Sequence, residues 1–78
     1  MPTIDAPFES ALTWLKGGGR VTRLGWNAPG QWVALQRPDA NSKMTLPYLY
    51  LRNTQGDLVP WAPTQGDLMA TDWEVVTA

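Results

Sequence analysis

The sequence predicts an α+β fold, in which one N-terminal helix packs on a small antiparallel sheet of four to five strands and a short helical turn lies near the C-terminus. Three observations support this prediction. Apolar residues recur at helical spacing near the N-terminus, several short alternating segments follow, and residues typical of turns separate those segments. At 78 residues the chain has the length of one domain, so we expect residues 1–78 to form a single domain.

One apolar face predicts the N-terminal helix. Its members are spaced at i, i+3, i+4 and i+7: Phe8, Ala11, Leu12 and Leu15. We expect the helix to run from about residue 7 to residue 16 and to end at the glycines of positions 17–19. These glycines precede a strand and lack a following lysine, so a phosphate-binding loop is disfavoured. Trp14 lies off the apolar face, so its indole either contacts a ligand or another subunit or folds over the sheet.

Five segments have the pattern of short strands: residues 20–26, 31–36, 46–52, 58–59 and 73–76. Turn-forming residues separate the first strand from the second and the third from the fourth. A polar loop at 37–45 separates the second strand from the third. In the third strand, Tyr48, Tyr50 and Arg52 share one face of the sheet, because side chains alternate along a strand.

The stretch from Leu58 to Trp73 organises the rest of the chain. Thr64 is followed three residues later by Asp67, which predicts a capping box, with the acid where the helix dipole favours negative charge. We expect Leu68 and Met69 to form the buried side of this short helix. The pentapeptide Thr-Gln-Gly-Asp-Leu occurs at 54–58 and at 64–68, and we expect a hairpin turn from the first copy and a helix start from the second.

Two tryptophans, Trp61 and Trp73, bracket the same stretch. Both indoles could be core anchors, since large side chains supply much of the core in so small a chain. Equally, they could be the walls of a pocket for a flat ligand, because the polar side chains of Thr64, Gln65 and Asp67 lie between them. The sequence leaves these two interpretations open.

Composition excludes several classes of function. The chain has no cysteine and no histidine, which removes thiol catalysis, disulfides, ordinary zinc sites and the usual general base. Its formal net charge of −1 argues against binding to polymeric nucleic acid. No apolar run approaches the ~20 residues of a membrane span, and the N-terminus lacks the pattern of a signal peptide. We therefore expect a cytoplasmic protein that does not act at a membrane.

The acids near the C-terminus are the remaining candidates for catalysis. Asp72 and Glu74 would share a strand face if the last strand began at Asp72, which makes a paired-carboxylate site conceivable. Asp67 is better explained by helix capping and Glu74 by a solvated strand face. We therefore expect a protein that is not an enzyme and needs no cofactor or metal.

A binding function fits the composition better, because five tryptophans are more than 78 residues bury easily. Aromatic rings stack on nucleobases, and arginine binds phosphate through two parallel hydrogen bonds. The groups available for such contacts are the rings of Trp26, Trp32, Trp61, Trp73, Tyr48 and Tyr50, the cations Arg20, Arg23 and Arg52, and the polar side chains of Asn27, Thr64 and Gln65. The nearly neutral charge fits a small, closed nucleotide better than a polymer.

The chain resembles one known family over about residues 8–76. Its motifs are Phe-x-x-Ala-Leu-x-x-Leu-Lys from Phe8, Val-x-Arg-x-x-Trp-Asn from Val21, Tyr50-Leu51 before the turn at Gly56, and Val-Pro-Trp-x-Pro-Thr-Gln-x-Asp-Leu-x-Ala-x-Asp-Trp from Val59. In combination these resemble the small phage proteins of the Thoeris anti-defence 2 family. The triple glycine and the loop at 37–45 depart from the family pattern.

The resemblance implies a function and an assembly. Members of the family are sponges that bind the cyclic ADP-ribose-type signal of bacterial TIR enzymes without degrading it, and some also sequester cyclic dinucleotides. They are homotetramers in the host cytoplasm, with ligand pockets between subunits. Carried over to this chain, the ligand contacts are Trp26, Asn27 and the loop from Trp61 to Asp67, which includes Thr64 and Gln65. Arg23, on the strand that leads to Trp26, is expected to meet a phosphate.

Two other functions remain as alternatives. One is a phage structural or protein-protein interaction module that uses exposed tryptophans as its interface. The other is a binder of single-stranded nucleic acid. Binding measurements with cyclic nucleotides and with an oligonucleotide separate these functions.

Overall fold

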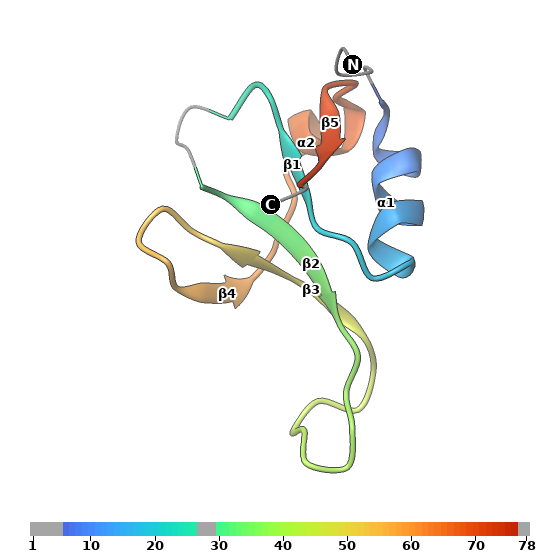
Figure 1. The fold of residues 1–78 in the computed structure, drawn as a ribbon, viewed down its shortest axis with the longest axis vertical. Coiled ribbons are helices and arrows are strands. Elements are labelled where there is room, and N and C mark those ends of the chain that lie inside the picture. The colour runs from blue at the N-terminus through green and yellow to red at the C-terminus, as the bar shows by residue number, and fades with distance from the viewer. Residues whose placement is uncertain (1–5, 27–29, 77–78) are drawn as a thin grey trace.

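The computed structural model describes residues 6–26 and 30–76 and confirms the predicted α+β fold (Figure 1). Five strands form one antiparallel sheet in the order β4-β3-β2-β1-β5, with two helices beside it. The elements are α1 (Phe8–Lys16), β1 (Val21–Arg23), β2 (Trp32–Gln36), β3 (Tyr48–Arg52), β4 (Leu58–Pro60), α2 (Gln65–Met69) and β5 (Trp73–Val75).

Helix α1 lies within the range that the apolar spacing predicts and covers one face of the sheet (Figure 1). Its Ala11 and Leu15 are fully buried and form the core with β-strand residues, among them Trp73. Trp14 is partly buried and also packs against this core. The helix ends at the glycines, where the N–H of Gly18 donates to the carbonyl of Leu15 at 3.0 Å and φ of Gly18 is +97°.

The first strand is shorter than the alternating pattern suggests. We expected residues 20–26, but β1 ends at Arg23, and a turn at 24–25 follows. The backbone N–H of Trp26 donates to the carbonyl of Arg23 at 3.3 Å, which closes this turn. Strand β5 pairs with the whole of β1, and the turn begins where that pairing stops, at Arg23 opposite Trp73.

The hairpin of β3 and β4 contains the first copy of the repeated pentapeptide. The carboxamide oxygen of Asn53 accepts the backbone N–H groups of Gln55 and Asp57, and Gly56 has φ of +87°. Strand β4 lies at one edge of the sheet. Pro60, which has no backbone N–H to donate, is tolerated there because one side of an edge strand has no partner strand. The second copy opens α2, so both predicted roles of the repeat are confirmed.

The orientation of α2 differs from the prediction. We expected Leu68 and Met69 on its buried side, but this is wrong: Leu68 is 37% exposed and Met69 is 77% exposed. The buried residue is Asp67, at 8% exposure. With only five residues, α2 turns the polar side of its capping box inward, where partners from β1 and the following turn meet it.

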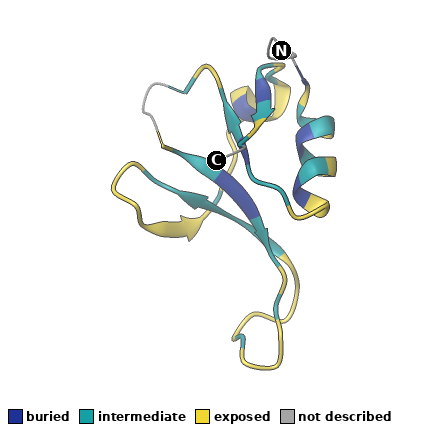
Figure 2. Ribbon diagram, in the orientation of Figure 1, coloured by how far each residue is buried: buried dark blue, intermediate teal, exposed yellow. Residues whose placement is uncertain are grey.

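The sheet has two unlike faces. Side chains alternate between the two faces along each strand. Val33 and the side chains on its face point toward α1. Tyr50 and its register partners Ala34 and Pro60 lie on the opposite face. Figure 2 shows that buried residues gather where β2, β1 and the helices meet, while β4 and the arm between β2 and β3 are mostly exposed. In Figure 1 this arm extends away from the rest of the fold.

Candidate functional site

Asp67 lies at the centre of a hydrogen-bonded cluster at the β1–β5 end of the sheet. Its Oδ1 atom accepts the guanidinium Nη1 of Arg23 at 2.9 Å and the indole Nε1 of Trp26 at 3.2 Å. Its Oδ2 atom accepts the backbone N–H of Thr64 at 3.1 Å, and the Thr64 hydroxyl accepts the N–H of Asp67 at 3.1 Å. This confirms the predicted capping box and shows that the same carboxylate also fastens α2 to β1.

Arg23 joins two carboxylates from different segments. Its Nε atom donates to Oδ1 of Asp72 at 2.8 Å, while its Nη1 atom donates to Asp67. The backbone N–H of Gly25 donates to the other carboxylate oxygen of Asp72 at 2.7 Å. The donors and acceptors of the cluster thus pair with one another. Among the described residues, no buried side-chain nitrogen or oxygen lacks a hydrogen bond.

These contacts lower the pKa of both carboxyl groups and so favour their ionised forms. Burial by itself would raise the pKa of Asp67, but the hydrogen bonds from the Thr64 backbone, Trp26 and Arg23 outweigh it and hold the pKa below its ordinary value. The hydrogen bond from Arg23 is the main reason that the pKa of Asp72 is lowered, against a smaller opposing effect of burial. The pKa of Arg23 is raised, chiefly by its hydrogen bond to Asp72.

We expect this cluster to make the protein less stable in acid. A carboxyl group whose pKa is lower in the folded state stabilises that state fully above the unfolded pKa, which is about 3.9 for aspartate. The contribution is lost as the pH falls below that value toward the folded pKa. The melting temperature should therefore decline between pH 5 and pH 2 more steeply in the wild type than in the variant Asp72→Asn, measured by circular dichroism. Parallel curves for the two proteins would contradict this expectation.

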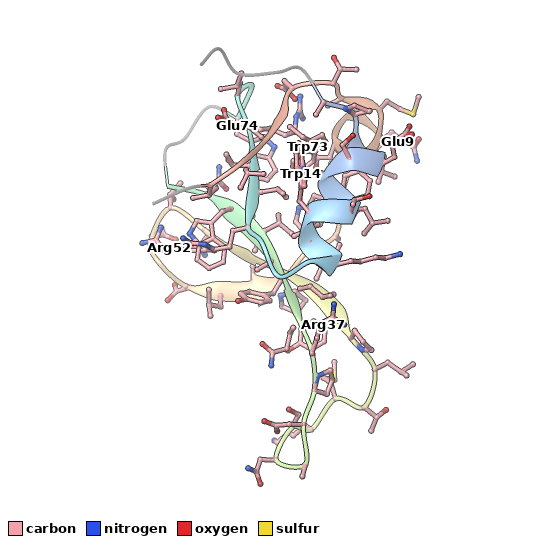
Figure 3. The ribbon with its side chains drawn as sticks, turned by 45° about the vertical axis from the view of Figure 1, so that its right-hand side comes forward. Glu9, Trp14, Arg37, Arg52, Trp73 and Glu74 are labelled. Atoms are coloured by element: carbon pink, nitrogen blue, oxygen red, sulfur yellow. The ribbon has the colours of Figure 1, made fainter. Side chains whose placement is uncertain are left out.

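An aromatic cluster adjoins the carboxylates, with Trp73 at its centre. Figure 3 labels Trp73, which lies beside α1. Its fully buried ring has three neighbours, at centroid distances of 5.5 Å to Phe8, 5.4 Å to Trp26 and 5.8 Å to Trp61. Its Nε1 atom donates to the backbone carbonyl of Asp67 at 3.0 Å. Trp73 is thus a core anchor.

Trp26 and Trp61 occupy an intermediate position. Both are partly buried and pack against the core through Trp73. Trp61 also contacts Phe8, at 6.0 Å between ring centroids. The part of each ring that remains accessible is the part available for a ligand.

Most of the predicted site residues come together. Arg23, Trp26, Thr64 and Asp67 are linked by hydrogen bonds, and Trp61 joins them through the Trp73 ring. Gln65 is exposed in the first turn of α2. Asn27 lies outside the described residues.

Asp72 is the residue whose role sequence reasoning missed. We considered it as one of a carboxylate pair with Glu74, but the structure pairs Asp72 with Arg23 and places Glu74 opposite Thr22 on the neighbouring strand. The available signal was that an acid precedes the last strand and a cation ends the first. These become neighbours only when the two strands pair antiparallel.

A cavity lies elsewhere in the described part of the chain. It measures about 160 Å³ and is lined by residues of β2, β3 and β4: Gln36, Tyr48, Tyr50, Leu58, Val59 and Pro60. On the same face, Trp32 packs edge-on against Tyr50 at 6.0 Å, and the Arg20 guanidinium lies 5.0 Å from the Trp32 ring. None of the predicted site residues within the described ranges lines this cavity, so the two locations are separate candidates for binding.

Two kinds of feature are absent from residues 6–26 and 30–76. No group of three or more acidic side chains is arranged to hold a metal ion. No helix in those ranges is long and apolar enough to cross a membrane.

Comparison with known proteins agrees with the resemblance that the motifs carry. The family model of the Thoeris anti-defense 2-like domain matches residues 6–76. The protein Thoeris anti-defense 2 of Bacillus phage SP01 is 28% identical over 83 residues, a match that covers 90% of this chain and 93% of that protein. Because the family model spans nearly the whole sequence, the chain belongs to the Thoeris anti-defense 2-like family.

Proposed function

We propose that this protein is a phage anti-defence protein that binds and sequesters a cyclic nucleotide immune signal without cleaving it. The signal proposed is of the cyclic ADP-ribose type made by TIR enzymes, with cyclic dinucleotides as a further class, and the site of action is the host cytoplasm. The family match supports an anti-defence role. The observation that carries the binding proposal is the pair of partly exposed indoles, Trp26 and Trp61, beside the capped end of α2.

The chemistry of this location suits a nucleotide. Trp26 and Trp61 pack against the buried Trp73 ring, which keeps them rigid, and a rigid indole face stacks on a base at low entropic cost. Exposed Thr64 and Gln65 supply hydrogen-bonding groups at its border. Asn27 belongs to the proposed site because it follows Trp26 in the sequence.

The two charged residues of the site, Arg23 and Asp67, differ from the indoles in that they form an ion pair. Their side chains are 21% and 12% exposed. They supply local charge at the site and hold Trp26 and α2 in place. A phosphate contact by Arg23 would be made by the part of its guanidinium that stays accessible.

The state of the acids supports binding without cleavage. A general acid at neutral pH needs a raised pKa, whereas the pKa values of Asp67 and Asp72 are both lowered by their hydrogen-bond donors. The chain also has no histidine or cysteine to act as base or nucleophile.

Calorimetry on the purified protein tests the proposal. The probes are isomers of cyclic ADP-ribose, then cyclic dinucleotides, with a single-stranded oligonucleotide as the competing class. We expect tight binding of a cyclic nucleotide, none of the oligonucleotide, and recovery of intact ligand after heating the complex. A new nucleotide product by chromatography would show cleavage and overturn sequestration.

Substitution of the indoles locates the site. Trp26→Ala and Trp61→Ala should each weaken binding by about 1–3 kcal/mol, or roughly five- to 150-fold, through loss of stacking. Trp14→Ala is the matched control, because Trp14 is also a partly buried indole that packs on the core but lies outside this cluster. All affinities are measured well below each variant's melting temperature. Equal losses in all three variants would place the site elsewhere.

We further propose that the protein is a homo-oligomer, as a tetramer with ligand sites between subunits. The support is the amount of apolar surface on the single chain, including Leu58 at 60% exposure, Leu46 at 75% and Met44 at 53%. Light scattering at micromolar concentration should give a mass near four chains. A mass near 8.6 kDa, that of one chain, would contradict the oligomer.

The alternative function, an interaction module for other phage proteins, has one observation in its favour. The face that carries Trp32, Tyr48 and Tyr50 contains the cavity and lies apart from the predicted ligand residues. If cyclic nucleotides fail to bind while Trp32→Ala abolishes association with another phage protein, this alternative replaces the sponge.

A further inference from the structure

Asp72 fastens the turn that carries Trp26. Asp72 accepts three hydrogen bonds, two from the backbone of this turn and one from the Arg23 side chain at the end of β1. The Leu24 N–H donates to the Asp72 carbonyl at 3.1 Å, the Gly25 N–H to Oδ2 at 2.7 Å, and the Arg23 Nε atom to Oδ1 at 2.8 Å. The partners lie 47 to 49 positions apart, so these contacts join two segments that are distant in the sequence.

Gly25 is required by the closeness of this contact. A Cβ atom at position 25 would lie 2.7 Å from Oδ2 of Asp72 and 3.3 Å from Nη2 of Arg23. The first distance is shorter than side chains tolerate, and φ of Gly25 lies outside the positive range, so space rather than backbone conformation demands glycine. A side chain here would require either the Asp72 carboxylate or the turn to shift, and either shift would disturb the hydrogen bond from the Gly25 N–H to Asp72.

The turn at 24–25 also sets the direction of the Trp26 indole. The ring stands edge-on to Trp73, with an interplanar angle of 80°, and its Nε1 atom reaches Oδ1 of Asp67. Both anchors of the ring lie on the C-terminal part of the chain, as does Asp72. The backbone of the turn and the tip of the indole are therefore held by the same region of the fold.

We propose that Asp72 and Gly25 are positioning residues that fix the orientation of the Trp26 indole for the ligand. This inference rests on the proposed function, because it assigns Asp72 no contact with the ligand and lets it act only through Trp26. It also explains why Arg23 is turned toward two carboxylates: its cation offsets one of the two negative charges that Asp72 and Asp67 bring to the turn.

The first test needs no ligand. Two-dimensional NMR resolves the indole Nε1–H signals, and the loss of one signal in Trp26→Phe identifies that of Trp26. Asp72→Ala and Gly25→Ala should each shift the Trp26 signal while the Trp32 signal, from the opposite face, stays in place. The double variant should resemble Asp72→Ala alone, because the carboxylate that Cβ would strike is gone. A Trp26 signal that does not move in any variant overturns the proposal.

A conservative variant guards against misfolding. Asp72→Asn keeps one oxygen acceptor for Gly25 or Arg23, so its Trp26 signal should lie between those of the wild type and Asp72→Ala. Asp57→Asn is the matched control, since it removes the same charge from the exposed β3–β4 turn. If Asp72 had only a structural role, its substitution would lower the melting temperature without a shift specific to the Trp26 indole signal.

The second test uses the cyclic nucleotide that the wild type binds best. Asp72→Ala should weaken its binding roughly tenfold, which corresponds to about 1.4 kcal/mol, and Asp57→Asn should bind as the wild type does. Wild-type affinity in a folded Asp72→Ala overturns the positioning role. If the wild type binds no cyclic nucleotide, the proposed function fails, and the NMR experiment still decides whether Asp72 orients Trp26.

Discussion

Trp73→Ala is expected to lower the free energy of unfolding by about 3–5 kcal/mol, the typical cost of truncating a buried tryptophan. Trp73 is the largest fully buried side chain, and three aromatic rings pack around it. Its loss leaves a cavity that Phe8, Trp26 and Trp61 all border, and it leaves the Asp67 carbonyl without its indole donor. Small domains have a total stability of about 5–15 kcal/mol, so this variant should lose a large share of its stability.

Urea unfolding followed by circular dichroism measures the loss. Trp73→Phe is the control, because phenylalanine keeps a ring in the cluster but lacks the Nε1–H donor, and its destabilisation should be clearly smaller. Met69→Ala, at an exposed position, should change stability by less than about 0.5 kcal/mol. If Trp73→Ala unfolds at the same urea concentration as Met69→Ala, the ring is not the centre of the core.

Asp67→Ala should cost about 3 kcal/mol, more than a helix cap alone. Loss of a cap costs about 0.5–2 kcal/mol. Asp67 also accepts hydrogen bonds from Arg23 and Trp26, and a hydrogen bond to a charged group contributes about 1.5–3 kcal/mol. Because Arg23 keeps Asp72 as a partner, its charge is not left uncompensated, which limits the loss.

Thermal and urea unfolding at neutral pH measure this effect. Asp57→Ala is the comparison, since it removes an exposed acid without touching the cluster. Thr64→Ala separates the contributions, because it removes only the hydroxyl of the capping box and should cost about 1 kcal/mol. If Asp67→Ala keeps the wild-type melting temperature and loses ligand binding, Asp67 is a ligand contact rather than the structural link described above.

The helix, the turns and the cap could be predicted because they depend on neighbours in the sequence. The apolar spacing from Phe8 to Leu15 defines α1, and Thr64 and Asp67 define the start of α2 through contacts three residues apart. Alternation and turn residues similarly located the strands to within a few residues, with β1 as the exception. These signals are local, so no knowledge of the tertiary fold is needed to find them.

The sequence by itself thus determined the fold class and which residues deserve testing, but not how those residues meet. Only the antiparallel pairing of β1 with β5 brings Arg23 beside Asp72, across 49 positions. The same packing decided that Trp73 is buried and that Trp26 and Trp61 pack edge-on against it. It also decided that Asp67 rather than Leu68 faces inward. The physical reason is that five residues of helix carry too little apolar surface to set their own orientation, so the ion pairs and hydrogen bonds from distant segments set it.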